Sequence, residues 1–173
     1  HSEFSLGALG LDGSGAGMTL NQAAPIVALA GTITAATMSG LSEGNHSVFV
    51  HSRDAYGNWG AFATLQLKVD KSGPTTSAVQ LRPNPNNGTL PYSPSCQSVR
   101  LDATFTEPGA GPIASTLANA EFFIDTVGAN GTGILITPSD GSFNSASENG
   151  YSYIPLITVN ALSNGNHTIS IHA

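Results

Sequence analysis

Histidine is the side chain with the widest chemical potential in this sequence, and four of the five histidines occur in corresponding pairs. His46 corresponds to His167, and His51 corresponds to His172, each pair being 121 residues apart. An imidazole ring can bind a metal ion or act as a general base. Residues that recur together with a scaffold usually serve that scaffold, so we favour a structural role for these histidines.

The segment from Asp54 to Trp59 is the sharpest local motif. Asp54 and Asn58 stand four residues apart with Gly57 between them, and their oxygens could bind Ca²⁺, with Asp70 as a further ligand. The interpretation that we favour is a hairpin without an ion. Asp54 would then cap backbone N–H groups while Gly57 and Asn58 lie near the left-handed region. Trp59 is expected to cover the end of a hydrophobic core.

Two glycine-rich stretches, 10–17 and 128–133, fall at corresponding places. A phosphate-binding loop needs a strand before it and a helix after it. Here residues 134–136 predict another strand, and neither loop is followed by lysine. We therefore predict flexible hairpin loops.

No catalytic constellation is visible in the sequence. It contains no Gly-x-Ser-x-Gly elbow, no His-Glu-x-x-His motif and no Cys–His pair at a useful spacing. The acidic residues are scattered and do not predict a glycosidase pair; they include Glu107, Glu121, Asp125, Asp140 and Glu148. We predict a protein that is not an enzyme, with no catalytic, cofactor-binding or metal site; Ca²⁺ at the hairpin is the alternative.

Charge and hydropathy exclude two classes of partner. The net charge is −6 and only 5 residues are Lys or Arg, whereas nucleic-acid binding needs clustered cations. No apolar run approaches the ~20 residues needed to span a bilayer, so we expect no membrane insertion. Cys96 is the only cysteine, so the chain forms no internal disulfide.

The elements that must position these residues are predicted to be strands. Alternating patterns predict strands at 47–52, 64–70, 99–105, 121–125, 151–154 and 168–171, with another beginning near Thr76. In the strand 99–105, Val99, Leu101, Ala103 and Phe105 share one face. Single helical turns are predicted within 34–41 and 158–162. Short strands joined by polar turns predict an all-β sandwich.

One segment occurs twice, which indicates a tandem array of one domain type. Residues 41–47 read LSEGNHS, and residues 162–168 read LSNGNHT. Farther upstream, Ser2-Glu3-Phe4 returns as Ala120-Glu121-Phe122. Gly73 and Pro74 break the strand pattern, so we place the boundary there, with domains at 1–72 and 73–173.

Residues 44–60, together with Val69-Asp70-Lys71-Ser72-Gly73-Pro74, resemble bacterial immunoglobulin-like repeats. Such repeats end in a G-x-H-x-V-x-V-x-x-x-D-x-x-G-N-W strand–turn–strand and a V-D-x-x-G-P linker. Residues 77–87 also resemble the first strand of such domains. The resemblance implies tandem Ig-like antiparallel β-sandwiches. It further implies that His46 stands where these sandwiches often carry a corner tyrosine, so that its ring satisfies a loop carbonyl.

The phase of the repeat predicts that each sandwich is incomplete in this chain. Residues 1–72 would hold the later strands of one domain, and residues 73–173 would lack the last strand of the next. His1-Ser2 is not a typical natural start, so the chain could be a piece cut out of register with its domains. Alternatively, other copies of the chain supply the missing strands head to tail.

We therefore expect a non-enzymatic structural protein at the cell surface or outside the cell. It would act as a stalk or a filament subunit built of Ig-like repeats. The alternative is an adhesin or a carbohydrate-binding accessory module. A module of that kind should carry a row of exposed aromatic rings, and the candidates are Tyr56, Trp59, Tyr92, Tyr151 and Tyr153.

Overall fold

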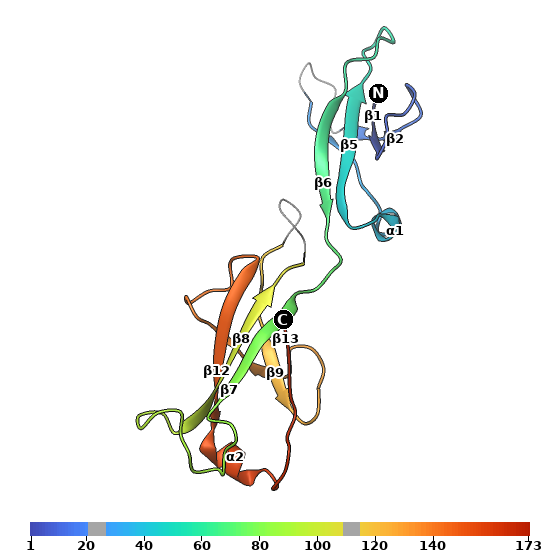
Figure 1. The fold of residues 1–173 in the computed structure, drawn as a ribbon. Helices are drawn as coiled ribbons and strands as arrows, with labels where there is room; N and C mark the ends of the chain where they lie inside the picture. Colours follow the sequence, from blue (N-terminus) through green and yellow to red (C-terminus); the bar gives the residue numbers. More distant parts are fainter. Residues whose placement is uncertain (21–26, 109–114) are drawn as a thin grey trace. The chain divides into compact units, whose positions relative to one another are not determined.

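The computed structural model describes residues 1–20, 27–108 and 115–173 (Figure 1). Strands hold 42 % of the chain and helices 8 %, and every strand pair is antiparallel, so the protein is all-β as predicted. The chain forms two compact units, His1–Lys71 and Ser72–Ala173. The division falls next to Gly73, where the sequence predicts a linker.

Unit 1, residues 1–71, contains one four-stranded sheet and a two-stranded ribbon. Its elements are β1 (Ser2–Leu6), β2 (Ala16–Gly17), β3 (Thr19–Leu20), β4 (Leu29–Ala30), α1 (Ala35–Gly40), β5 (Gly44–Ser52) and β6 (Ala63–Val69). The strand order in the sheet is β2-β1-β5-β6, and β3 pairs with β4. In this sheet β5 is an inner strand, paired with β1 on one side and β6 on the other.

The short helix α1 is set by local chemistry. Thr34 provides the N-cap, because its side-chain oxygen accepts a hydrogen bond from the Thr37 N–H at 3.2 Å. The helix ends at Leu41, whose backbone is extended and whose N–H donates to the Met38 carbonyl. Gly44 then opens β5 with φ +126, a conformation that favours glycine.

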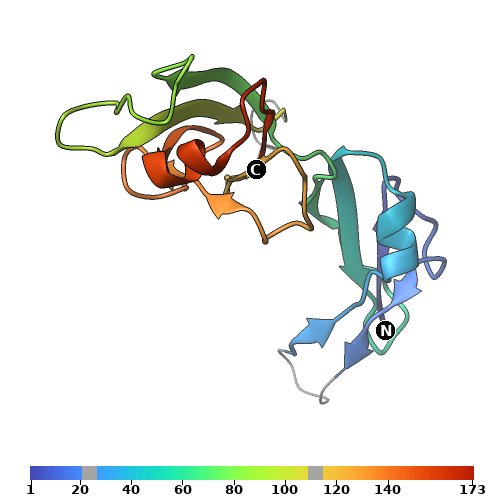
Figure 2. The ribbon, with the colours of Figure 1, turned by 90° about the horizontal axis from the view of Figure 1, so that it is seen from below.

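Unit 2, residues 72–173, contains two sheets that face each other. Its elements are β7 (Thr75–Arg82), β8 (Ser98–Thr106), β9 (Glu121–Ile124), β10 (Ile134–Leu135), β11 (Thr137–Pro138), β12 (Ser147–Pro155), α2 (Leu156–Ala161) and β13 (Ile169–His172). The sheets have the orders β10-β9-β13 and β11-β12-β8-β7. The helix α2 directly follows β12 at one end of the unit, and Figure 2 shows it nearest the viewer.

The hydrophobic core of unit 2 lies between these sheets. Burial alternates along β8, and the predicted inward residues are all buried: Val99, Leu101, Ala103 and Phe105. Phe122 from β9 meets them from the opposite sheet, and both Phe105 and Phe122 are fully buried. The prediction of one apolar face in this strand is therefore confirmed.

Several strand pairs of unit 1 have counterparts in unit 2 with the same register. Glu3 lies opposite His51 in the β1–β5 pair, and Glu121 lies opposite His172 in the β9–β13 pair. The ribbon β3–β4 pairs Thr19 with Ala30, and β11–β12 likewise pairs Thr137 with Tyr151. The self-similar segments of the sequence thus form similar local structures.

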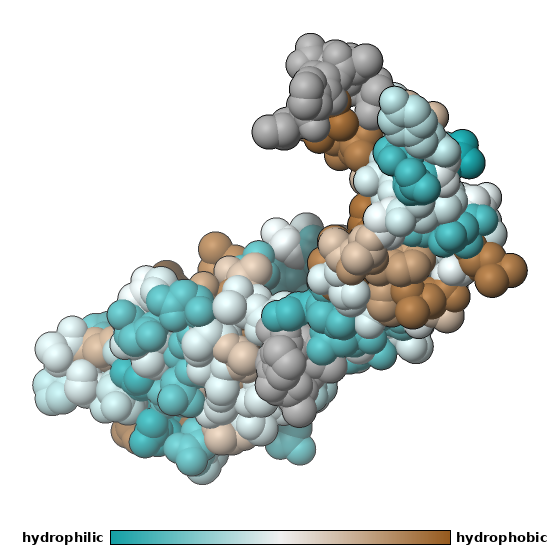
Figure 3. All heavy atoms as spheres, turned by 90° about the horizontal axis from the view of Figure 1, so that it is seen from above, coloured by the Kyte–Doolittle hydropathy of each residue, from teal (hydrophilic) through white to brown (hydrophobic). Residues whose placement is uncertain are grey.

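The two units differ in what covers these strands. Among the described residues, unit 1 has no second four-stranded sheet, and Phe4 is only half-buried where its counterpart Phe122 is fully buried. Leu65 on β6 is 53 % exposed, and Figure 3 shows hydrophobic residues on the surface of this unit. In unit 2 the counterpart of β5 is β13, which pairs only with β9 among the described strands.

Candidate functional site

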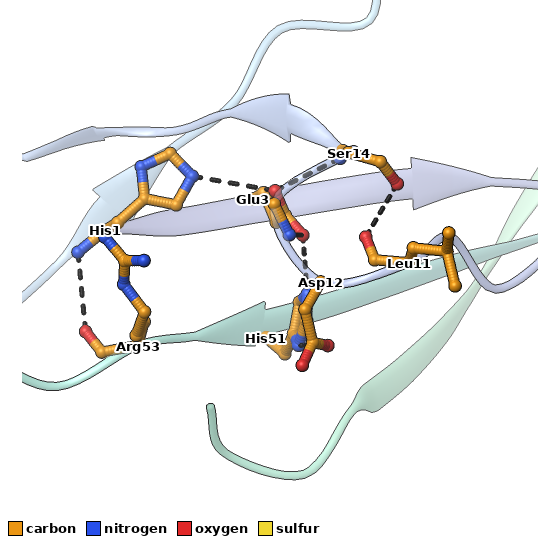
Figure 4. Close-up of polar contacts among 9 residues, drawn as sticks. His1, Glu3, Leu11, Asp12, Ser14, His51 and Arg53 are labelled. Atoms are coloured by element: carbon orange, nitrogen blue, oxygen red, sulfur yellow. Dashed lines mark hydrogen bonds and ion pairs between the residues drawn. The ribbon is translucent and has the colours of Figure 1, made fainter. Parts of the chain in front are cut away.

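A buried glutamate–histidine pair joins β1 to β5 in unit 1 (Figure 4). His51 Nε2 lies 2.8 Å from Glu3 Oε1, and each side chain is only 2 % exposed. Because a carboxylate only accepts, the imidazole Nε2–H is the donor. The two residues are 48 positions apart and meet because the β1–β5 register places them opposite each other.

The glycine-rich loop between β1 and β2 wraps around the same carboxylate. The Gly13 N–H donates to Glu3 Oε1 at 2.8 Å, and the Gly15 N–H donates to Oε2 at 3.1 Å. Ser14 folds the loop back by donating from its hydroxyl to the Leu11 carbonyl at 2.6 Å. We predicted a flexible hairpin here, but two backbone N–H groups anchor the loop to the buried glutamate.

Unit 2 repeats this arrangement. Glu121 accepts hydrogen bonds from the Gly131 N–H at 2.8 Å and the Gly133 N–H at 2.6 Å. His172 Nε2 lies 2.9 Å from Glu121 Oε1. We call these two groups the Glu–His anchors: Glu3, His51, Gly13 and Gly15 in unit 1, and Glu121, His172, Gly131 and Gly133 in unit 2.

The histidine is covered in unit 1 and open in unit 2. The His51 ring is stacked between Trp59, 4.2 Å away between ring centroids, and Phe62, 3.9 Å away. Both covering rings follow β5 in the sequence. His172 stacks only on Phe123 among the described residues, at 6.0 Å, and its side chain is 41 % exposed. Trp59 was expected to cover the end of a core, and it covers this anchor instead.

The anchors keep their carboxylates ionised. Burial by itself raises the pKa of Glu3, but the hydrogen bonds from His51, Gly13 and Gly15 outweigh it and hold the pKa below the ordinary 4.5. Burial also raises the pKa of Glu121, but the N–H donors of Gly131 and Gly133, together with His172, outweigh it and lower the pKa.

This geometry fits a structural role better than a chemical one. Among the described residues, three donors of the same unit use the Glu3 oxygens, and His1 Nε2 lies 3.6 Å from Oε2. His51 Nδ1 is buried with no hydrogen-bond partner in the described part of the chain, and it lies 3.9 Å from Asp12 Oδ1. Residues 1–20, 27–108 and 115–173 contain no group of three His, Cys, Asp or Glu side chains placed to hold a metal ion.

The other histidine pair makes the predicted contact with a loop carbonyl. His46 Nε2 lies 2.8 Å from the Ser42 carbonyl oxygen, and His167 Nε2 lies 2.9 Å from the Ser163 carbonyl oxygen. His167 also places Nδ1 2.7 Å from Asp125 Oδ2. Since both partners of His167 only accept, both ring nitrogens must carry hydrogen, and the ring is then charged.

The electrostatics agree with a charged His167. The Ser163 carbonyl raises the pKa of His167 most, and Asp125 raises it further. The hydrogen bond from His167 lowers the pKa of Asp125, and the Thr168 N–H adds to this effect. With Nε2 committed to a carbonyl, the ring cannot act as a general base on a substrate.

The Asp54 hairpin closes without an ion. Asp54 Oδ1 accepts from the N–H groups of Tyr56 and Asn58, both at 2.9 Å, and Oδ2 accepts from Asn58 Nδ2 at 3.0 Å. The Asn58 side-chain bond lowers the pKa of Asp54 most. Gly57 has φ +93 as expected, but Asn58 was wrongly expected in the left-handed region, because one positive-φ residue is enough for this turn. Ca²⁺ binding stays an untested alternative.

Three of the five candidate aromatic residues gather on the outer face of unit 2. Arg100 lies 4.6 Å from the ring centroid of Tyr151, 5.5 Å from that of Tyr92 and 5.8 Å from that of Tyr153. The rings are tilted, with interplanar angles of 54° and 69°. Asp102 binds Arg100 at 2.8 Å. These tyrosines therefore surround a guanidinium and do not form a flat row; Tyr56 and Trp59 lie in unit 1.

The remaining candidate residues either accept hydrogen bonds from backbone N–H groups or lie away from the anchors. Glu148 Oε1 accepts from the N–H groups of Asn144 and Ser145, which lower its pKa. Glu107 is buried, and its Oε2 has no hydrogen-bond partner among the described residues. Cys96 is half-buried in the turn before β8.

The sequence interpretation missed the anchors, although both halves of the signal were visible. Glu3 recurs as Glu121, and His51 recurs as His172. What was missing was the strand register, which makes each glutamate the neighbour of its histidine.

Comparisons with protein-family models, curated proteins and solved structures find no match to this chain. The likeness to bacterial Ig-like repeats therefore depends on the sequence motifs alone. In the described part of the chain, no helix has the length and apolar character needed to cross a membrane.

Proposed function

We propose that this chain is a structural segment of an extracellular or cell-surface protein. Tandem Ig-like β-sandwich repeats of the bacterial type would form its stalk or filament, and its role would be mechanical. The antiparallel sheets carry the load. The Glu–His anchor fixes the β1–β2 loop to β5 in unit 1 and the β9–β10 loop to β13 in unit 2.

The recurrence of the Glu–His anchor is the observation that supports this proposal most. In both units the buried glutamate binds two loop N–H groups and one histidine of the same unit. An anchor that recurs with the fold and forms its hydrogen bonds within its own unit has a structural role. The His46 and His167 contacts with loop carbonyls follow the same rule.

Two measurements test the proposal. Protease treatment of intact producing cells should remove the protein, and an antibody against it should label the cell surface. Negative-stain electron microscopy of the purified chain should show elongated particles or regular filaments. Protection from protease in intact cells would contradict the location, and monodisperse compact monomers would contradict the filament.

A carbohydrate-binding module is the second candidate, and the gathering of Tyr92, Tyr151 and Tyr153 on one face favours it. Their ring faces already contact Arg100, so a sugar would have to displace the guanidinium or bind at the exposed edges. A glycan array with the wild-type chain and with Tyr153→Ala tests this function. Binding that is lost in the variant would support the module over the stalk.

A further inference from the structure

The outer edge of β13 corresponds to an edge that is occupied in unit 1. There, β5 pairs with β6 in a register that sets Val48 opposite Leu65 and Val50 opposite Ala63. The repeat aligns Val48 with Ile169 and Val50 with Ile171. Among the described residues, β13 is the last strand of its sheet.

The hydrogen-bonding groups on this edge point outward. The Asp125 N–H donates to the Thr168 carbonyl at 2.8 Å, so these two residues form a bonded pair. Bonded and non-bonded pairs alternate along an antiparallel ladder. Ile169 and Ile171 therefore turn their N–H and C=O groups away from β9, toward the open edge.

A cavity beside this edge opens into the core of unit 2. Its volume is about 320 Å³, and β7, β8, β9, β12, α2 and β13 all contribute to its lining. The lining includes Leu81, Val99, Ile124, Ile154, His167 and Ile169. We call the open edge of β13 together with this cavity the β13 groove.

The β5–β6 register indicates what fits the groove. Residues opposite each other in an antiparallel pair place their side chains on the same face. A strand of the β6 pattern would set its Leu65 position beside Ile169 and its Leu67 position beside His167, both of which line the cavity. Its Gln66 position would meet Thr168, the counterpart of Ser47, whose hydroxyl accepts from Gln66 at 3.1 Å in unit 1.

The exposure of His172 supports the same occupant. In unit 1, Trp59 and Phe62 precede β6 and stack on both sides of His51. His172 occupies the corresponding place and is 41 % exposed. A segment that begins with these two aromatic residues and continues as β6 would cover the anchor and fill the cavity together.

We propose that the β13 groove binds an extended strand with the sequence pattern of residues 58–70, antiparallel to β13 and in the β5–β6 register. This inference rests on the proposed function, because it names the kind of partner through which Ig-like units are joined. The partner is recognised by backbone pairing along the edge and by two leucine side chains in the cavity.

The test uses the full chain and a fluorescently labelled synthetic peptide with the sequence of residues 58–70. Anisotropy should show saturable binding below about 1 mM. Hydrogen exchange should show added protection at the Ile169 and Ile171 amides, which face the open edge, and the His172 ring should lose solvent exposure in NMR titrations.

Two peptides with equal added charge provide the matched control. One carries Leu65→Asp and Leu67→Asp, which place carboxylates in the cavity, and it should bind at least about tenfold more weakly. The other carries Thr64→Asp and Lys68→Gln, which change the peptide charge by the same amount and face away from the core, and it should lose less than about threefold in affinity.

Three results would overturn the proposal: no binding at about 1 mM, equal weakening by both charged peptides, or new protection that leaves the Ile169 and Ile171 amides unchanged. None of these would bear on the stalk function, which the surface-labelling experiment tests separately.

Discussion

Replacing Gly133 by alanine tests how tightly the glutamate-anchored loop of unit 2 is packed. A Cβ there would lie 2.8 Å from Glu121 Oε2, 2.9 Å from the Phe122 carbonyl oxygen and 2.9 Å from Phe123 Cζ. Such distances are shorter than real Cβ contacts, and the carbonyl belongs to β9, so the loop has to move. Overpacking of this kind lowers the free energy of unfolding by about 1–3 kcal/mol.

The matched control is Gly131→Asn in the same loop. Both glycines donate their N–H to Glu121, and neither substitution removes that donor. Gly131 has φ +80 and nothing within 4 Å of its Cβ position. Asparagine accepts this left-handed conformation better than other non-glycine residues, as Asp125 already does at φ +61. The control should therefore destabilise unit 2 by less than about 1 kcal/mol.

Thermal unfolding followed by hydrogen exchange in β9 and β13 measures the difference. In a domain of about 100 residues, 1 kcal/mol shifts the midpoint by about 4–8 °C, so Gly133→Ala should lower it by about 5–20 °C. Trp59 is the only tryptophan and lies in unit 1, so its fluorescence should report an unchanged transition. Equal midpoints for the two variants would refute the steric argument.

The remaining predictions concern the core, the anchors and the hairpin. Phe122→Ala should destabilise unit 2 by about 3–5 kcal/mol. Phe4→Ala, at the half-buried counterpart in unit 1, should lower the free energy of unfolding by less than half as much. Equal losses in chemical denaturation would contradict the difference in burial between the two side chains. Because folding lowers the pKa of Glu121, the ionised carboxylate stabilises unit 2 above pH 4.5, and this stabilisation is lost as the pH falls through the pKa of the folded state. The melting midpoint should therefore drop in acid, and Glu121→Gln should make that drop smaller. Because folding raises the pKa of His167, the charged ring stabilises unit 2 fully below pH 6.5, and this stabilisation is lost as the pH rises through the pKa of the folded state. Asp125→Asn should move the NMR titration curve of His167 down toward pH 6.5, and an unmoved curve would exclude the ion pair. Adding a chelator should leave the melting midpoint unchanged, and a lower midpoint would restore the Ca²⁺ interpretation of the hairpin.

The contacts that the sequence predicted are the local ones. His46 and Ser42 are four residues apart, and so are Asn58 and Asp54, so one turn of known chemistry brings each pair together. The buried face of β8 follows from its alternation in the same way. The anchors were not predicted, since Glu3 and His51 are 48 residues apart and only the pairing of two particular strands joins them.

The sequence by itself determined the strand pattern, the doubled segment and the short helical turns, because periodicity and turn residues act over a few neighbouring positions. Only the tertiary structure decided which glutamate meets which histidine, that Trp59 covers His51, and that β13 is an edge strand beside a cavity among the described strands. These features depend on strand register and on which sheets face each other. Register is set by the packing of a whole face at once, and a shift of one residue would turn every side chain to the other side.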